Sequence, residues 1–575
     1  MPVTPRTAAP SFARAALASL AALGLSACAA LPPEAVSQAE DIQILALNDF
    51  HGNLEPLPGE QRYRTAEGEE ARAQLGGAAR LGAMLAGLRA GQDHTVTVAA
   101  GDLIGASPLV SAYYLDEPTI MALSRAGLEI AAVGNHEFDK GVAELRRMQD
   151  GGCNDGRPVG ARQPCRLDPF EGASFTYLAA NVIGPNERAL FPGSVMRQFG
   201  AAKVGFIGMT LKDTGILSSP GGTVGYRFED EAATANAEAA RLRAAGADTV
   251  VLLIHEGART DPAYSVAGCP GLDGPLLPIL DRLDPAIRLV VSGHTHNAYA
   301  CEVPAPGGTT RLVTSAGRYG YFVTDIRLTV DPASDAVTGF SAVNRPVEAR
   351  GGEQADVAAL VARYSRDVAQ EAAKVVGRID GSLAAAPDAF YRPLDHLVAD
   401  AQLAATQATD DGGAQFALMN PGGVRTTFEP AANGAVTYGQ IFALQPFGNT
   451  LSVVELTGAE LIAGLEEALS RATPGNVRNA LLIPSHNLGY AFDLSRPAGS
   501  RLVSLTLDGR PVEPGATYRA TVNNFIASGG DGFAFLARAR PVAGGILDLD
   551  AIESYLAGGV AAPTGARVRD LTPAG

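Results

Sequence analysis

Acidic, amide and imidazole side chains follow a series of short apolar runs in the first half of the chain. They stand in the stretches ALNDFHGN, AAGD, VGNHEFD, LLIHEG and SGHTH, which contain Asp49, His51, Asp102, Asn135, His136, Asp139, His255, His294 and His296. A single histidine at such a position is usually structural, but five of the eight histidines of the chain belong to this set. Carboxylate oxygens, an amide oxygen and imidazole nitrogens together suit borderline divalent cations such as Zn²⁺ or Mn²⁺.

The size of this set favours two metal ions over one. A carboxylate shared by both ions would offset the repulsion between them, and we assign this role to Asp102. In SGHTH only Thr295 separates His294 from His296, and we interpret the two histidines as ligands of different ions.

The elements that would position these residues form an α/β pattern. From residue 41 to about 345, short β-branched or apolar runs such as DIQILALND, TVTVAAGD and TVVLLIHEG alternate with helical stretches. In open α/β sheets, ligands bind at the carboxyl ends of the strands, where the loops converge. We therefore predict that the strand-end residues meet in a first domain at 41–350.

A second domain is predicted after a linker helix. Alanine and valine recur at helical spacing between charged residues over about 353–378, so we place the linker at 351–380 and the second domain at 381–575. The second domain opens with the helical stretch LDHLVADAQLAATQA and continues with strand-like runs. The pair Asp508-Gly509 is typical of a hairpin turn.

Three glycine-containing loops of the second domain carry candidate substrate residues. NPGGVR, QPFGN and NNFIASGGDGF contribute Asn420, Arg425, Phe447, Asn449, Phe525 and Asp531. Two phenylalanines from separate loops can hold a flat base between them, and Arg425 can bind a phosphate or carboxylate with two hydrogen bonds. Asp531 can accept from ribose hydroxyls. Each residue alone is compatible with an ordinary core or turn position.

In combination these motifs resemble the calcineurin-like metallophosphoesterases, specifically the bacterial periplasmic 5′-nucleotidase and UDP-sugar hydrolase family, over nearly the whole mature chain. The resemblance implies an N-terminal αββα sandwich, a linker helix and a C-terminal α+β nucleotide-binding domain. It implies a first metal site and a second one that share Asp102: Asp49, His51, Asp102 and His296 at the first, and Asn135, His255 and His294 at the second.

The resemblance also assigns His136 to stabilising the transition state or assisting the leaving group, with Asp139 orienting its imidazole. A helix-capping role is the alternative for Asp139. Two departures stand out. Some members carry Gln where His296 stands, and the arginine and Leu-Gly-Asn turn common near the start of the second domain are replaced by DAFYRPLDHLVADA, where Arg392 is a candidate substitute.

The implied activity is release of phosphate from nucleoside 5′-phosphates by two divalent ions (Zn, Mn or Co), in nucleotide salvage. UDP-sugars and cyclic nucleotides are further candidate substrates. A related phosphoesterase with a different substrate, and a catalytically silent surface protein that binds a partner, are the alternatives.

The N-terminus predicts export. Arg6 and Arg14 precede an apolar run that is too short to span a bilayer, and LSAC, ending at Cys28, resembles a bacterial lipobox. We expect a signal peptide at 1–27, a lipidated Cys28, a tether at 28–40, and a monomer in the periplasm or on the outer membrane that meets the membrane only through its lipid. A plain signal peptide is the alternative.

The charge argues against nucleic acid as a partner. The whole chain carries −16, and removal of a signal peptide with two arginines and no acids makes the charge about −18. We therefore expect a small nucleotide as the substrate, and the metal ions would supply the positive charge that an anionic substrate needs.

Four further cysteines are expected to form two disulfides in an oxidising compartment. Of the three possible pairings we favour Cys153 with Cys165 and Cys269 with Cys301. The first pair would close a short loop, and the second would link the loops on either side of SGHTH. Metal binding by these thiols is the alternative, although none has CxxC spacing.

Overall fold

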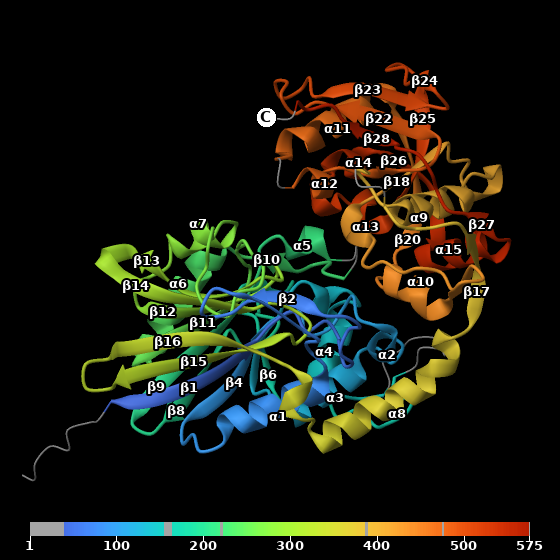
Figure 1. Cartoon of the computed structure of the whole chain (residues 1–575). Helices are drawn as coiled ribbons and strands as arrows, with labels where there is room; N and C mark the ends of the chain where they lie inside the picture. The colour runs from blue at the N-terminus through green and yellow to red at the C-terminus, as the bar shows by residue number, and fades with distance from the viewer. Residues whose placement is uncertain (1–38, 154–163, 219–221, 386–388, 474–475, 574–575) are drawn as a thin grey trace, which may run out of the picture. The chain divides into compact units, whose positions relative to one another are not determined.

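The computed structural model describes residues 39–153, 164–218, 222–385, 389–473 and 476–573 (Figure 1). Residues 38–575 cluster as one compact unit, and within it the strands of residues 40–346 and those of residues 375–570 form separate sheets, here called the N-terminal and C-terminal domains. The expected signal peptide, Cys28 and nearly all of the expected tether lie outside the described residues.

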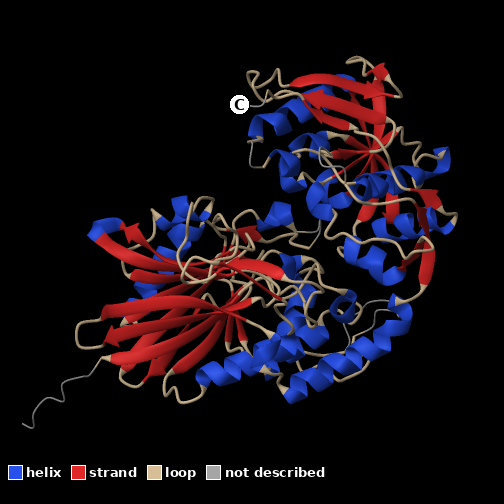
Figure 2. Ribbon diagram, viewed as in Figure 1, coloured by secondary structure: helices blue, strands red, loops and turns tan. Residues whose placement is uncertain are grey.

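The N-terminal domain contains two six-stranded sheets that stack on each other (Figure 2). The first has the order β16-β15-β1-β4-β5-β6, with β1 (Glu40–Leu47), β4 (Thr95–Ala100), β5 (Ile130–Ala132), β6 (Thr176–Leu178), β15 (Phe322–Asp331) and β16 (Ala336–Pro346). The second has the order β13-β14-β12-β11-β9-β8, with β8 (Ser194–Phe199), β9 (Ala202–Thr210), β11 (Thr249–His255), β12 (Ile287–Ser292), β13 (Ala298–Ala305) and β14 (Thr309–Ala316). Two short pairs accompany them: β2 (Gln61–Arg64) with β3 (Glu70–Ala73), and β7 (Val182–Ile183) with β10 (Arg227–Phe228).

Alternation of side chains along the buried strands explains the stacking. Ile42 and Ile44 of β1 share one buried cluster with Val251 and Leu253 of β11, whereas Leu45 belongs to the cluster on the other face of its sheet. Successive residues of a strand point to opposite faces, so a continuous apolar run is buried on both sides.

Helices cover the outer faces of both sheets. The helices of this domain are α1 (Ala78–Arg89), α2 (Leu109–Ala112), α3 (Glu117–Arg125), α4 (Val142–Asp150), α5 (Thr214–Leu217), α6 (Glu231–Ala244) and α7 (Leu276–Leu280), of which the short α2 and α5 lie against other helices and turns. Leu242 of α6 and Leu276 and Ile279 of α7 pack with Ile254 and Val290 of the second sheet. The predicted αββα sandwich is confirmed.

The parallel strands determine where the candidate ligands lie. β1, β4, β5 and β6 run parallel in the first sheet, and β9, β11, β12 and β14 run parallel in the second. Their carboxyl ends therefore share one edge in each sheet, and the predicted ligands follow these ends.

The predicted linker helix is shorter than expected. Helix α8 (Ala355–Ala372) buries Val357, Leu360, Tyr364 and Val368 along one side, but Val375–Asp380 forms strand β17. Prediction of helix through residue 380 was wrong because β17 pairs with two strands of the C-terminal domain, β19 (Ala435–Thr437) and β27 (Val560–Ala561). Non-local pairing of this kind overrides a local helical pattern.

The C-terminal domain combines three sheets with short helices. A five-stranded sheet has the order β21-β18-β25-β20-β26, with β18 (Phe416–Met419), β20 (Thr450–Thr457), β21 (Ile483–Pro484), β25 (Thr517–Asn523) and β26 (Arg540–Leu547). A four-stranded sheet has the order β24-β23-β22-β28, with β22 (Leu488–Phe492), β23 (Leu502–Leu507), β24 (Arg510–Pro511) and β28 (Val568–Asp570). β17, β19 and β27 form the third sheet.

The helices of this domain are α9 (Pro393–Ala404), α10 (Tyr438–Leu444), α11 (Gly458–Arg471), α12 (Val477–Ala480), α13 (Asn524–Ala527), α14 (Ala534–Arg538) and α15 (Asp548–Ala557). The predicted opening helix corresponds to α9. The predicted hairpin joins β23 to β24, and both of its turn residues, Asp508 and Gly509, have the positive φ that such tight turns require.

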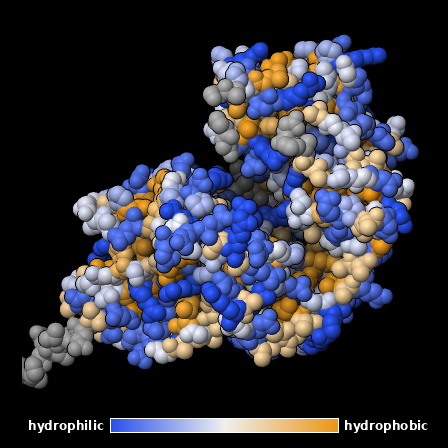
Figure 3. Space-filling model, in the orientation of Figure 1, coloured by the Kyte–Doolittle hydropathy of each residue, from blue (hydrophilic) through white to orange (hydrophobic). Residues whose placement is uncertain are grey.

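Both expected disulfides are present in the structure: Cys153 with Cys165, and Cys269 with Cys301. The second ties β13, the strand that follows SGHTH, to the loop after β11. None of the helices in the described ranges has the length and apolar character to cross a membrane. On the face drawn in Figure 3, hydrophilic residues predominate and hydrophobic ones occur in small groups.

Candidate active site

The predicted ligands come together at the carboxyl ends of the parallel strands, and most adopt an unusual backbone conformation. A left-handed φ between 47° and 66° occurs at Asp49, His51, Asp102, His294 and His296. Non-glycine residues rarely adopt this conformation, which is unfavourable unless the surroundings enforce it. Such clustering of left-handed residues is typical of a functional site.

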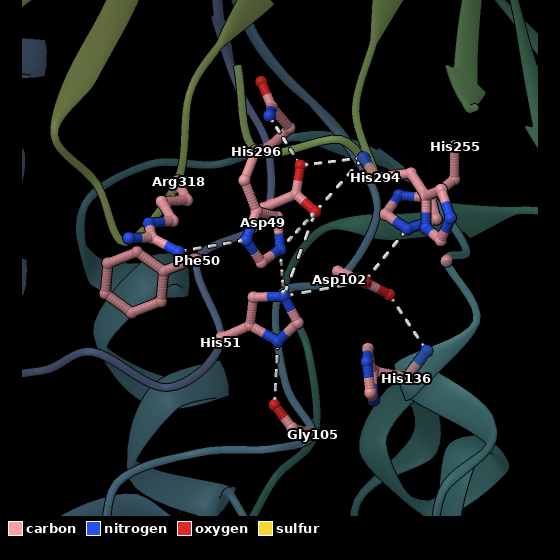
Figure 4. A network of polar contacts seen from close by, with 12 residues as sticks. Asp49, Phe50, His51, Asp102, Gly105, His136, His255, His294, His296 and Arg318 are labelled. Atoms are coloured by element: carbon pink, nitrogen blue, oxygen red, sulfur yellow. Dashed lines mark hydrogen bonds and ion pairs between the residues drawn. The ribbon is translucent and has the colours of Figure 1, made fainter. Parts of the chain in front are cut away.

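The first predicted ligand group surrounds the side chain of His51 (Figure 4). Its Nε2 lies 3.2 Å from Nε2 of His296, 3.9 Å from Oδ1 of Asp49 and 3.6 Å from Oδ2 of Asp102. His296 Nε2 is 3.4 Å from Oδ1 of Asp49. Donor atoms of the other three residues that the resemblance assigns to this metal therefore lie within 3.9 Å of Nε2 of His51.

The second predicted group meets the first at Asp102. Oδ2 of Asp102, which faces His51, also lies 2.9 Å from Nε2 of His255. Nδ1 of His294 lies 3.1 Å from Oδ1 of Asn135, and Asp102, His255 and His294 offer donor atoms within 4.8 Å of one another. Asp102 thus stands between both groups, as expected for a shared carboxylate.

Backbone carbonyls orient two of the imidazoles. Nδ1 of His51 lies 2.9 Å from the carbonyl of Gly105, and Nδ1 of His255 lies 2.7 Å from the carbonyl of Ala100. Because a carbonyl accepts only from a protonated nitrogen, Nδ1 of each ring carries a proton, and Nε2 of the neutral ring has the lone pair that can bind a metal.

Burial makes this cluster unfavourable without a cation. Asp49, His51, Asp102 and His255 are at most 1% exposed. Burial, reinforced by the charge of Asp102, raises the pKa of Asp49 to about 7 despite the opposing effect of His255. Burial and the charge of His255 lower the pKa of His294 to about 3, which keeps its ring neutral.

The residues present suit divalent cations. Nε2 of His255 is buried and lies 2.9 Å from Oδ2 of Asp102. Burial opposes a charge on this imidazole, but Asp102 and Asp49 outweigh burial and raise the pKa of His255 to about 10, so the site favours a cation at this nitrogen. Imidazoles, an amide oxygen and two carboxylates form a mixed nitrogen and oxygen donor set of the kind that Zn²⁺ and Mn²⁺ bind.

His136 lies beside the ligands, and its ring is held by Asp139. Nδ1 of His136 is 2.8 Å from Oδ2 of Asp139, and the two residues stand at the ends of the 3₁₀ turn that follows β5. Burial opposes a charge on this imidazole, but the carboxylates of Asp139 and Asp102 outweigh it and raise the pKa of His136. Nε2 of the ring therefore remains as a proton donor. Asp139 orients His136 as expected.

Glu137 has a larger part in the site than the sequence indicated. Its carboxylate accepts the backbone N–H groups of Asp102 (2.9 Å), Leu103 (2.7 Å) and Gly134 (2.7 Å), and lies 3.4 Å from that of Ile104. It therefore joins the loop that carries Asp102 to the loop that carries Asn135 and His136. A signal in the sequence was its acidic side chain directly after the predicted site residues Asn135 and His136.

The predicted substrate residues lie next to the metal ligands. A cavity of about 170 Å³ is lined by Asn135, His136, Asp139, His294, Asn420, Gly422, Gly423, Arg425, Phe447, Asn449, Phe525 and Asp531. It contains all six substrate residues that the sequence predicted, although they come from three separate loops of the C-terminal domain.

The two phenylalanine rings have different neighbours. The ring of Phe447 stacks on that of His136, with centroids 5.8 Å apart and planes at 21°. The ring of Phe525 packs on Gly530, where an added Cβ would come within 2.7 Å of three ring atoms. The glycine thus lets Phe525 lie directly on the loop that carries Asp531.

Arg425 carries a cation with unused donors. Nε and Nη2 of its guanidinium are buried and have no hydrogen-bond partner, while its backbone N–H donates to Leu444. After burial, its charge is the largest cause that lowers the pKa of His51. A guanidinium with two buried, unpaired donors beside a cluster of metal ligands is suited to an anionic ligand.

Arg392 does not replace the missing phosphate-binding arginine. Its guanidinium binds Asp395, with Nε 2.9 Å from Oδ1, and its backbone N–H donates to the same carboxylate, so that the pair caps the start of α9. Arg392 is absent from the residues that line the cavity. Of the two candidate arginines, Arg425 alone lines it.

Comparison with known proteins agrees with this geometry. Residues 42–298 match the family described as calcineurin-like phosphoesterase, and residues 375–538 match the 5′-nucleotidase, C-terminal domain. A cell wall protein of Listeria monocytogenes, Lmo0130, is 30% identical over 91% of this chain and 68% of its own length. The endonuclease YhcR of Bacillus subtilis is 27% identical over 85% of this chain, which spans only 37% of that protein.

A solved structure gives the same result at the level of the fold. The 5′-nucleotidase precursor of Thermus thermophilus superposes with a TM-score of 0.73 at 28% identity, covering 92% of this chain and 99% of that one. The similarity therefore includes both domains and the strand ends at which the candidate ligands meet.

Proposed function

This chain belongs to the 5′-nucleotidase family of metal-dependent phosphoesterases, and from that premise we propose that it releases phosphate from nucleoside 5′-phosphates with two divalent cations. The proposal rests on the cavity. Metal ligands, His136 and Asp139 line it together with two phenylalanines, Arg425 and Asp531. A phosphate at the ligand end and a base between aromatic rings would occupy both parts of such a cavity.

We assign Asp49, His51, Asp102 and His296 to one cation and Asn135, His255 and His294, with Asp102 shared, to the other. Zn²⁺, Mn²⁺ and Co²⁺ are the candidates, since the donors mix imidazole with oxygen. When bound, two such cations would lower the pKa of a water molecule and neutralise phosphoryl charge.

The side chains of the protein perform the remaining steps. Arg425 would donate its free Nε–H and Nη2–H groups to phosphoryl oxygens and so orient the phosphate. His136, whose Nδ1 is held by Asp139, would donate from Nε2 to the phosphoryl group or to the leaving oxygen as negative charge develops there. Phe447 stacks on this imidazole and restricts its rotation.

The C-terminal loops would select a nucleoside. Phe447 and Phe525 provide apolar faces for the base, Asn449 provides an amide for its edge, and Asp531 provides an acceptor for ribose hydroxyls. UDP-sugars and cyclic nucleotides are further candidate substrates because the same groups would bind their nucleoside part. Nucleotide salvage is the physiological role that we propose.

We further propose that the protein is exported and attached through Cys28 to a membrane as a lipoprotein of the periplasm or outer membrane, and that it is a monomer. The support is Arg6 and Arg14 ahead of an apolar run, and the lipobox-like LSAC. Labelling with a radioactive fatty acid in wild type and in Cys28→Ala tests this: incorporation in the wild type alone supports lipidation, and equal labelling contradicts it.

The experiment that tests the activity is phosphate release by protein lacking residues 1–28. AMP, UDP-glucose and bis-p-nitrophenyl phosphate would each be supplied after chelation and after addition of Mn²⁺, Zn²⁺ or Co²⁺. We expect metal-dependent turnover that favours AMP. Turnover of bis-p-nitrophenyl phosphate alone would favour a related phosphoesterase with another substrate. Single-stranded DNA, supplied as a further substrate, tests for the endonuclease activity named for the relative YhcR. No turnover with any metal would favour a binding protein.

A further inference from the structure

We propose that Asn523, a buried residue outside the cavity, is a positioning residue that sets a preference for substrates with a vicinal ribose diol. The inference rests on the proposed function, because it takes Asp531 as the acceptor for the sugar. Asn523 acts through a chain of side-chain hydrogen bonds from the start of α13 to Asp531.

The orientation of the Asn523 amide is determined by the backbone. Its Oδ1 accepts the N–H of Ile526 at 2.9 Å as the N-cap of α13, so its Nδ2 must point the other way. Nδ2 donates to Oδ1 of Asn420 at 2.9 Å. Asn523 is 0% exposed. No solvent is therefore available to satisfy either end in a flipped orientation.

The chain of hydrogen bonds continues from Asn420 to Asp531, which lines the cavity. Because Oδ1 of Asn420 is occupied by Asn523, Nδ2 of Asn420 faces Asp531 and donates to its Oδ2 at 2.7 Å. Asn420 is 3% exposed. Two hydrogen bonds between side chains thus join the N-cap residue of α13 to the carboxylate of Asp531.

The hydrogen bond from Asn420 is the side-chain contact that orients the carboxylate of Asp531. Asp531 has a left-handed φ of 54° between two glycines, and Nη1 of Arg471 donates to its backbone carbonyl at 3.2 Å. Arg471 holds the main chain of the loop, while Asn420 holds the side chain. Oδ1 of Asp531 is left as an acceptor for a ligand in the cavity that this residue lines.

Without the Asn523 amide, the buried Oδ1 of Asn420 loses its donor. Asn420 would shift toward another donor, and its hydrogen bond to Asp531 would weaken. The Asp531 carboxylate could then turn away from the cavity, and a diol would lose its acceptor. An unpaired buried polar group of this kind weakens binding by roughly tenfold.

The test is a double-mutant cycle read by binding and not by turnover. Calorimetry would give the dissociation constants of adenosine and 2′,3′-dideoxyadenosine for wild type, Asn523→Ser, Asn420→Ala and the double variant. Serine keeps an N-cap acceptor for α13 but does not reach Asn420. Asn524→Ser is the matched control, since Asn524 is the next residue and its Oδ1 accepts the N–H of Thr450 instead.

We expect the wild type to prefer adenosine, Asn523→Ser to lose roughly tenfold of that preference, and Asn524→Ser to retain it. The double variant should lose no more than Asn420→Ala alone, because Asn523 acts through Asn420. Asn523→Thr, also a capping residue, serves if the serine variant does not fold. Equal binding of both nucleosides by the wild type, an unchanged preference in Asn523→Ser, or fully additive losses would each overturn the inference.

The binding data also distinguish an error in the role of Asn523 from an error in the proposed function. If the wild type bound neither nucleoside, the nucleotide pocket itself would be wrong. If it bound both nucleosides equally well, the pocket for the base would stand, and the roles of Asp531 and Asn523 toward the ribose would fall.

Discussion

Glu137 accepts a hydrogen bond from the backbone N–H of Asp102, with 2.9 Å between Oε2 and the nitrogen. The same oxygen accepts the N–H of Gly134, directly before Asn135. Asp102 faces both ligand groups. The buried Glu137 carboxylate therefore fixes the main chain at ligands of both predicted metal sites. Burial, followed by the charge of Asp102, raises the pKa of Glu137 to about 7.

We predict that Glu137→Gln loses about 10 to 100-fold in metal affinity or activity, as is usual when a group that supports metal ligands is removed. Glutamine places an NH₂ group against backbone N–H groups that need an acceptor. Metal content after dialysis at fixed Mn²⁺, and turnover against Mn²⁺ concentration, measure the effect. Glu256→Gln is the control, because Glu256 also follows a ligand but accepts only the N–H of its neighbour Gly257 among the contacts described. Equal metal affinity in both variants would contradict the role of Glu137.

For His136→Ala we predict a fall in kcat of about 10² to 10⁴-fold with metal content unchanged, because the imidazole contacts the reacting group and not the cations. Asp139→Asn should give a smaller fall, since the ring stays but loses the carboxylate that orients it. Parallel metal analysis and steady-state kinetics on AMP distinguish the outcomes. Loss of metal in His136→Ala would show instead that the residue is a ligand, as its proximity to His51 and Asp102 allows.

The two phenylalanines should separate binding from chemistry. Phe525→Ala should raise KM for AMP by roughly tenfold, the effect of losing one stacked base, and leave turnover of bis-p-nitrophenyl phosphate unchanged. Phe447→Ala should also lower kcat for both substrates, because Phe447 stacks on His136. Identical kinetic profiles of the two variants would argue against this difference.

Replacement of Arg425 by Met should weaken substrate binding and stabilise the fold. Nε and Nη2 of Arg425 are buried without partners, and an unsatisfied buried donor destabilises by about 1 to 3 kcal/mol. We expect a higher KM for AMP together with a higher midpoint of thermal unfolding in the absence of substrate. Arg425→Lys keeps the charge without the paired donors and should show an intermediate KM. A less stable Arg425→Met protein would indicate that the guanidinium has a structural partner.

A histidine far from the metal ligands should make stability depend on pH. Burial, followed by the charge of Arg567, lowers the pKa of His396 from its usual 6.5 to about 4. Between pH 6.5 and pH 4, His396 is therefore protonated in the unfolded chain but neutral in the folded chain. The free energy of unfolding is highest above pH 6.5 and decreases as the pH falls toward 4. The expected loss between pH 7 and pH 5 is about 2 kcal/mol.

Chemical denaturation at both pH values measures this loss in wild type and in His396→Leu, which should lose about 2 kcal/mol less of its stability on acidification. His486→Gln is the control, because the His486 side chain is 63% exposed. The same pH dependence in His396→Leu as in wild type would exclude His396 as its source.

The strand ends and the donor types of the candidate site were evident in the sequence. Buried parallel strands appear as continuous apolar runs, and residues at or just after their carboxyl ends, such as His255 and Asp49, must lie at one edge of a sheet. Both disulfide pairs also followed from the sequence, since each links loops close to one another along the chain or across SGHTH. The substrate loops were recognisable because glycine-rich turns present their aromatic and polar residues in short motifs.

Only the tertiary structure decided which groups hold those residues in place. Glu137 meets the N–H of Asp102 across 35 positions of sequence, and Asn523 meets Asn420 across 103. Val375–Asp380 became a strand because one partner, Ala435–Thr437, lies about 60 residues away in sequence and the other, Val560–Ala561, lies near the end of the chain. Sequence patterns report local periodicity and residue chemistry, whereas a hydrogen bond between distant segments exists only after the chain has folded, so these roles depend on non-local contacts that no local pattern contains.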